Sequence, residues 1–245
     1  MQKIKLLLFF LFIYCGRSLA GESDSLSKIY AQENLHDSVR INAAIDASKL
    51  FLDGKNDSAF YFVNKAWLLL HPLPSSYHKL KSQANIFYVL GSVYVNRNNT
   101  KLGLYYLNYS LAIFLKIKHR VGSAYLLNNI GLVYNDKSDY TQAITYYLRS
   151  LKIKEQLGNK RSLAFAYLNL GLVYYSIQDY DKALEYYNKA LVIFKLEEDK
   201  QPLTILLYNM GVVYFDKKEY STAIQFEEQS LDLSKRIEDK ESEAK

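Results

Sequence analysis

Apolar residues recur along most of this chain at three- and four-residue spacing, in stretches separated by short polar interruptions. The stretch 123–136 places an apolar or aromatic side chain on one helical face at four positions: Leu127, Ile130, Val133 and Tyr134. Polar residues then interrupt the pattern. Asp139 is a suitable N-cap for a second helix over 140–156, and Gly158 is a suitable helix end because glycine tolerates the left-handed conformation. The pattern therefore predicts a pair of antiparallel helices.

The same two-helix pattern returns further along the chain. It predicts helices over 162–176, 180–196, about 203–215, and 220–237. A weaker pair precedes them over 39–52 and 57–70, and the Pro-containing segment 71–74 ends the second of these helices. The predicted fold class is all-α.

A glycine recurs every forty residues within this pattern. Because glycine inside a helix costs about 1 kcal/mol relative to alanine, its recurrence indicates close helix crossings. The repeated structural positions are the glycines Gly91, Gly131, Gly171 and Gly211, the alanines Ala143, Ala183 and Ala223 on the second helices, and the packing tyrosines Tyr94, Tyr134, Tyr174 and Tyr214. A fixed period of this length is typical of a stacked repeat fold.

Two of the units carry the pattern in full. It reads Leu127, Ile130, Gly131, Tyr134, Ala143, Tyr147, Ser150 in one unit and Tyr167, Leu170, Gly171, Tyr174, Ala183, Tyr187, Ala190 in the next. The third unit has Glu227 at an aromatic position. These residues resemble the tetratricopeptide repeat, in a long variety of forty residues instead of the usual 34. The resemblance implies a right-handed superhelical solenoid of antiparallel helix pairs.

The predicted organisation has five parts. Residues 1–20 are a signal peptide, 21–38 a leader segment, 39–80 a degenerate first repeat, 81–237 the repeats of period forty, and 238–245 the start of a further, incomplete repeat. The last helix then either caps the array itself or is followed by more chain in a longer protein.

The first twenty residues have the features of a secretory signal. Lys3 and Lys5 precede the apolar run 6–15, which is too short to span a bilayer, and small residues flank a cleavage point after Ala20. We expect an exported protein, periplasmic or extracellular, with an inner-membrane anchor as the alternative. Cleavage would lower the formal net charge from +6 to +3, so little basic character remains to indicate nucleic-acid binding. Membrane contact is expected only through an uncleaved signal peptide or a missing C-terminal segment.

The composition and motifs favour recognition over catalysis. The one cysteine, Cys15, lies in the predicted signal peptide, so disulfides and thiolate chemistry are not expected in the mature chain. The four histidines have no zinc-site or triad partner at motif spacing, and each helical glycine stands alone instead of in a phosphate-binding loop. We predict no enzyme activity, no metal and no cofactor.

Asparagines just before the glycines are the candidate binding residues. Asparagine is a mediocre helix former, so Asn129, Asn169 and Asn209, with Asn128 beside the first, call for an explanation. The resemblance implies that they face a concave groove and bond the backbone of an extended peptide, which an amide can do as donor and acceptor. The expected groove neighbours are Tyr125, Asn135, Phe165 and Tyr175. The alternative is that each asparagine only bonds the neighbouring repeat.

The functional prediction is a non-enzymatic scaffold that binds a protein or an extended peptide. The resemblance extends to the exported sensor portions of bacterial signalling proteins, which makes a sensory role one form of this expectation. Two alternatives stay open: a cytoplasmic-type regulator that binds a signalling enzyme, and a purely structural assembly module.

Overall fold

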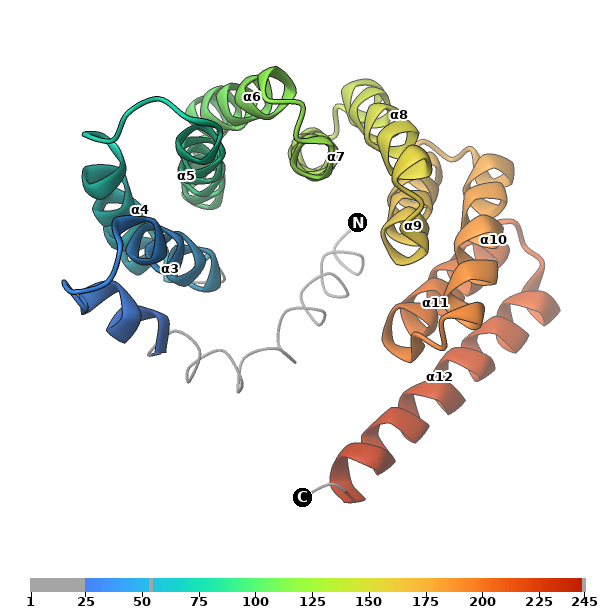
Figure 1. The fold of residues 1–245 in the computed structure, drawn as a ribbon. Helices are drawn as coiled ribbons and strands as arrows, with labels where there is room; N and C mark the ends of the chain where they lie inside the picture. The colour runs from blue at the N-terminus through green and yellow to red at the C-terminus, as the bar shows by residue number, and fades with distance from the viewer. Residues whose placement is uncertain (1–24, 53–54, 244–245) are drawn as a thin grey trace. The chain divides into compact units, whose positions relative to one another are not determined.

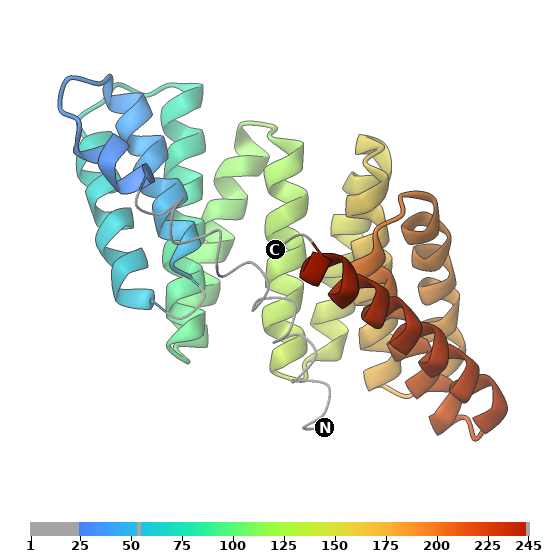
Figure 2. The same cartoon turned by 90° about the horizontal axis from the view of Figure 1, so that it is seen from below.

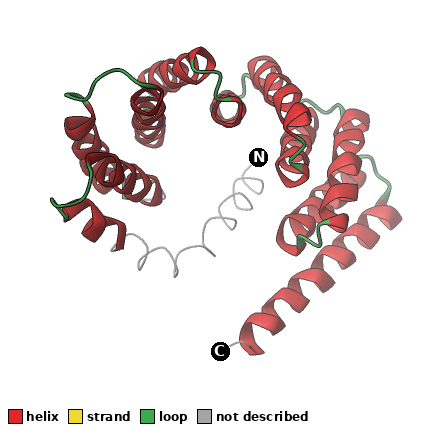
Figure 3. Cartoon of the chain, viewed as in Figure 1, coloured by secondary structure: helices red, strands yellow, loops and turns green. Residues whose placement is uncertain are grey.

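The structure is a computed structural model that describes residues 25–52 and 55–243. The predicted signal peptide and residues 21–24 of the predicted leader lie outside the described residues. A short helix covers residues 25–31. Figure 3 shows that the described chain consists of helices joined by short loops, as the all-α prediction requires. No described helix is both long and apolar enough to cross a membrane.

The chain divides into two compact units, Met1–Leu126 and Leu127–Lys245. The first contains α3 (Asp37–Leu50), α4 (Asn56–Leu70), α5 (Tyr77–Asn96) and α6 (Thr100–Lys116). The division falls within α7 (Arg120–Asp136), and the second unit continues with α8 (Tyr140–Leu157), α9 (Lys160–Ser176), α10 (Tyr180–Leu196), α11 (Lys200–Asp216) and α12 (Tyr220–Glu243). Helices that follow one another in a unit lie side by side and antiparallel (Figures 1 and 2). We call α5, α7, α9 and α11 the first helices and α6, α8, α10 and α12 the second helices.

The helix ends follow from local chemistry. The Asp139 carboxylate accepts from the backbone N–H of Gln142, and Gly158 ends α8 with a left-handed φ of 71°, as predicted for both. The other connections from α5 to α12 place ordinary residues in the same left-handed conformation, one every twenty residues. They are Asn98, Lys118, Ser138, Gln178, Glu198 and Lys218. From α5 onward each connection is therefore a tight turn, and the geometry repeats at half the period of the sequence.

At three of the four repeated glycines a Cβ would lie closer than 3.0 Å to an atom of the following second helix, and what each glycine faces differs. Gly91 and Gly103 mark a close backbone approach, because a Cβ on either glycine would lie 3.0 Å from the carbonyl oxygen of the other. At Gly131, however, a Cβ would lie 2.7 Å from the ring of Tyr147 on α8, and Gly171 faces Tyr187 in the same way. In those repeats the glycine makes room for a buried tyrosine ring more than for a neighbouring backbone.

The recurring tyrosines pack as expected, each against an aromatic ring of the following second helix. Tyr94 stacks on Tyr106 at 5.5 Å between ring centroids, and Tyr214 stacks on Phe226 at 5.3 Å. Tyr134 and Tyr174 make equivalent pairs at 5.4 Å with Tyr146 and Tyr186 respectively. One stacked pair per repeat therefore joins the first helix to the second.

Two predicted boundaries differ from the structure. Helix α5 begins at Tyr77, after the N-cap Ser76, so the first repeat ends in the Pro-containing connection and not at residue 80. Helix α12 continues to Glu243 without a break at Ile237, so residues 238–243 extend it and do not begin another helix. The glutamates and lysines of this segment favour helix.

Candidate functional site on the first helices

The predicted asparagines all lie on first helices and are partly buried. Asn128 and Asn129 lie on α7, Asn169 on α9 and Asn209 on α11, all in the second unit. The Asn169 Nδ2 donates a hydrogen bond to the Asn128 Oδ1 at 3.0 Å. This bond joins neighbouring repeats, as the stacking alternative requires for that pair.

Asn129 and Asn209 differ from that pair. Within the described residues neither side-chain amide makes a hydrogen bond, so each keeps donors and an acceptor for another molecule. The Asn128–Asn169 pair also keeps part of its capacity, because each amide has more than one donor or acceptor. Two of the four asparagines therefore link neighbouring repeats, and the side-chain amides of the other two have no hydrogen-bond partner within the described residues.

Asn135 presents an unsatisfied atom near the end of α7. Its Oδ1 is buried and has no hydrogen-bond partner in the described part of the chain. A buried carbonyl oxygen without a partner costs free energy of about 1–3 kcal/mol. A donor from a ligand or a water would remove this cost.

Tyr175 is tied to the next repeat by its hydroxyl. The phenol donates to the Asp216 Oδ2 on α11 at 2.8 Å, and its ring lies 6.1 Å from that of Tyr180. Burial raises the Tyr175 pKa, and the bond to Asp216 and the proximity of Tyr208 raise it further. The hydroxyl therefore stays protonated and donating across the neutral pH range.

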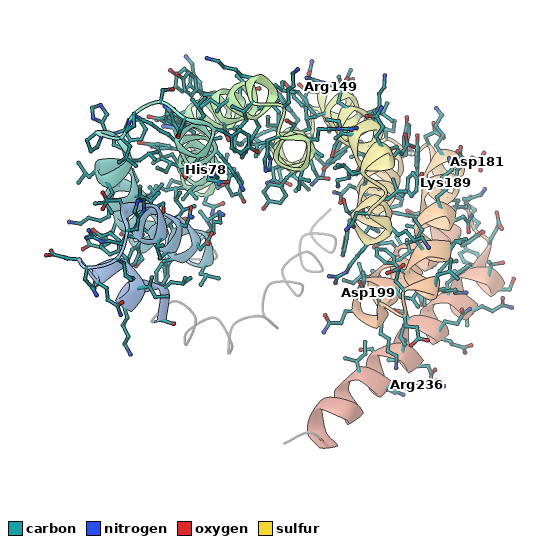
Figure 4. All side chains as sticks on the ribbon, viewed as in Figure 1. His78, Arg149, Asp181, Lys189, Asp199 and Arg236 are labelled. Atoms are coloured by element: carbon teal, nitrogen blue, oxygen red, sulfur yellow. The ribbon has the colours of Figure 1, made fainter. Side chains whose placement is uncertain are left out.

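The two remaining predicted neighbours have different surroundings. Phe165 packs edge-to-face on Phe194 at 5.2 Å, with the Arg161 guanidinium 5.7 Å from its ring centroid, so it contributes mainly to the core of the second unit. Arg161 also pairs with the carboxylate of Asp199, labelled in Figure 4. Tyr125 belongs to the first unit and is half exposed.

Sequence reasoning missed three residues of these surroundings. The Tyr125 hydroxyl hydrogen-bonds that of Tyr88 on α5 at 2.9 Å, and Tyr175 lies by Asp216 and Tyr208. The forty-residue period of the sequence could have identified them. Tyr88, Asn128 and Tyr208 share one register of the forty-residue period, and Asp216 stands forty residues after Ser176 and eighty after Asp136.

The described side chains hold no group of three or more His, Cys, Asp or Glu residues placed to bind a metal ion. What the first helices of the second unit do offer is a row of amides and phenols with hydrogen-bonding capacity. That chemistry suits the binding of a polar main chain.

The fold and these first helices define an all-α helical-repeat protein. Residues 122–196 and 162–236 each match the tetratricopeptide repeat family. Residues 122–236 of the chain are therefore tetratricopeptide repeats, and the predicted family is confirmed there.

Solved structures of similar fold have low sequence identity to the chain. BtubC from P. vanneervenii is 17% identical, with a TM-score of 0.75 and 90% of each chain covered. A Rap protein solved in complex with competence and sporulation factor is 20% identical, with a TM-score of 0.69, and the match covers 89% of this chain and 60% of that one. A kinesin light chain repeat protein from Podosopora anserina is 13% identical, with a TM-score of 0.64, covering 82% and 98%. A comparison with curated protein sequences gave no match.

Proposed function

We propose that this protein is a non-enzymatic scaffold that binds an extended polypeptide on the first helices of its second unit. The observation that carries the proposal is that the side-chain amides of Asn129 and Asn209 are partly buried and have no hydrogen-bond partner among the described residues. An internal bond between repeats explains Asn128 and Asn169 but not these two. A peptide backbone supplies the donor and acceptor that each free amide needs.

We propose further that the protein is exported and that binding has a sensory role. The support for export is the pattern of residues 1–20, in which two lysines precede an apolar run and small residues flank Ala20. A fusion of these residues to a reporter that is active only after export tests this part. A cytoplasmic reporter would favour the alternative of a regulator that binds a signalling enzyme.

The binding proposal is tested by separating the two kinds of asparagine. A random peptide library is selected on the purified chain, and the dissociation constant of a selected peptide is measured by calorimetry. We expect Asn129→Ala with Asn209→Ala to weaken binding about tenfold or more, with the melting temperature unchanged, because each lost amide contact contributes about 1 kcal/mol.

The matched control is Asn128→Ala with Asn169→Ala. Loss of the bond between repeats should lower stability by about 1 kcal/mol, which corresponds to about 2–4 °C in melting temperature for a chain of this size. If the Asn129 and Asn209 variant binds every selected peptide normally but melts at a lower temperature, the asparagines are structural and the binding proposal is wrong.

A further inference from the structure

The outer face of α6 differs from that of every other second helix. It exposes Tyr105 and Tyr109, with relative exposures of 61% and 48%. The residues at the same repeat positions are Thr145 and Arg149 on α8, Glu185 and Lys189 on α10, and Gln225 and Gln229 on α12. Arg149 and Lys189 are labelled in Figure 4. Three second helices thus present polar or charged side chains where α6 presents a pair of aromatic rings.

These two tyrosines are held in place by the rings beneath them. Tyr105 and Tyr109 are nearly parallel, with 20° between planes and 6.4 Å between centroids. Phe87 on α5 packs edge-to-face against Tyr109 at 4.8 Å and stacks on Tyr106. Trp67 on α4 packs on Phe87 at 5.7 Å. An aromatic pair that is already ordered loses little conformational entropy on binding, which is the property of interface hot spots.

The charges around this face are of one sign. Between Asp57 and Asp136 the sequence has no aspartate or glutamate but has eight lysines and arginines. Lys101 and Lys116 are exposed at the two ends of α6 and have no ion-pair partner among the described residues. In the second unit, acidic side chains are interspersed with basic ones, as in the pairs Lys189–Glu185 and Lys217–Asp181.

The cations and the rings form a single stripe. Lys101, Tyr105, Tyr109, Ala112 and Lys116 follow one another at four- or three-residue spacing and are all exposed, so they line one side of the helix. With a rise of about 1.5 Å per residue, the two lysines are separated by about 22 Å along the helix axis. An extended polypeptide covers this distance in about seven residues.

We propose that this stripe, Lys101–Tyr105–Tyr109–Ala112–Lys116, is a docking surface for an acidic segment of another protein, with carboxylates on the two lysines and apolar side chains on the tyrosines. The surface belongs to a second helix of the first unit, so it is separate from the asparagines of the first helices. A polypeptide suits this stripe better than a membrane, because two lysines add only about 1 kcal/mol each at an anionic lipid surface. The ordered aromatic pair is instead the kind of anchor that contributes most to protein–protein binding.

The test measures binding of a labelled glutamate–tyrosine copolymer to the purified full chain by fluorescence anisotropy, with polyglutamate of equal length alongside. We expect the copolymer to bind more tightly. Tyr105→Ser with Tyr109→Ser should weaken copolymer binding about tenfold or more, since interface aromatics contribute more than 1 kcal/mol each, and should leave polyglutamate binding nearly unchanged. Lys101→Glu with Lys116→Glu should weaken the binding of both the copolymer and polyglutamate. The remaining binding of either polymer should be no more sensitive to salt than in the wild type.

The matched control is Lys152→Glu with Lys195→Glu, which makes the same change in net charge on exposed positions of α8 and α10. It should alter copolymer binding less than about twofold. Circular dichroism verifies that each variant folds. The tyrosine and lysine changes are also measured in the Asn129→Ala, Asn209→Ala background, where they should have the same effects, because copolymer binding in that background no longer depends on the asparagines.

Three outcomes would overturn the proposal. One is equal binding of the copolymer and polyglutamate with no effect of the tyrosine changes. Another is a loss in the α8 and α10 control as large as the loss in the α6 variants. The third is tighter, tyrosine-dependent binding to phosphatidylglycerol vesicles or to a single-stranded oligonucleotide, which would assign the surface to a membrane or a nucleic acid instead.

Discussion

Lys154 occupies a core position of α8, and we expect its replacement by methionine to stabilise the protein. The residues forty before and forty after it are Phe114 and Phe194, which are 2% and 0% exposed. Lys154 itself is 8% exposed, and its ammonium has no hydrogen bond or ion pair within the described chain. Methionine has a similar unbranched shape and no charge, so it fills the same space without the cost of burying an ammonium group.

The magnitude follows from the pKa of this lysine. Burial lowers the Lys154 pKa from 10.5 to about 8. Since one pKa unit corresponds to about 1.4 kcal/mol, the charged form is penalised in the native state by about 3 kcal/mol. Lys154→Met should therefore raise the free energy of unfolding at pH 7 by up to about 3 kcal/mol, with Lys152→Met on the exposed side of the same helix as the control that changes it little.

The wild-type protein should also become more stable as the pH rises. Below about pH 8, Lys154 is charged in both states and the native state bears the full penalty. Between about 8 and 10.5 it loses its proton in the native state but keeps it in the unfolded chain, so the unfolded state binds more protons and stability increases with pH. The gain from pH 7 to pH 9.5 is about 2 kcal/mol. Burial raises the pKa of Tyr147 and Tyr187, so ionisation of tyrosines in the unfolded chain opposes the trend at higher pH.

Urea unfolding followed by circular dichroism at pH 7 and pH 9.5 provides the measurement. The stability difference between Lys154→Met and wild type should shrink from about 3 to about 1 kcal/mol over this range, because only the wild type has the titrating group. A difference that stays constant with pH, or a methionine variant less stable than wild type at pH 7, would show that the ammonium is well solvated or paired and would refute the reasoning.

Two further predictions compare matched backbone positions, each by urea unfolding. Gly171→Ala should lower the free energy of unfolding by about 1–3 kcal/mol, because the new Cβ meets the ring of the fully buried Tyr187 at 2.3 Å. Gly211→Ala should lower it less, because the nearest atom is Cγ of the exposed Glu227 at 3.0 Å and the Ala223 carbonyl oxygen is 3.3 Å away. Equal losses at both sites would contradict this account of the glycines. Gln178→Gly should raise the free energy of unfolding by about 0.5–1 kcal/mol, because residue 178 has a φ of 63°, which glycine adopts without strain. Gly158→Ala should lower it by a similar amount. A Cβ at residue 158 would meet no atom within 4 Å, so only the backbone strain of a positive φ remains. Unchanged stability in both would exclude strain at these turns.

The helices and their pairing were predictable because both follow from short-range patterns. The spacing of apolar residues defined each helix face, and the N-cap at Asp139 and the helix end at Gly158 were correct. The left-handed turns at Lys118 and Glu198 were not predictable, because neither residue type favours that conformation. Helix α12 continues to Glu243 through residues with high helix propensity.

The binding face was harder to predict because equivalent positions are not the positions that touch. The forty-residue period aligns Asn129 with Asn169, yet Asn169 bonds Asn128 across a separation of 41 residues. Tyr175 and Asp216 show the same separation of 41, whereas Tyr88 and Tyr125 are 37 apart. These three contacts between repeats therefore run diagonally to the sequence register, whereas Asn96 bonds Asn56 at a separation of 40. The asparagines look equivalent in the sequence, but in the structure two of them are hydrogen-bonded to each other and the amides of the other two have no partner among the described residues. Because the two kinds differ, separate substitutions can test the groove proposal.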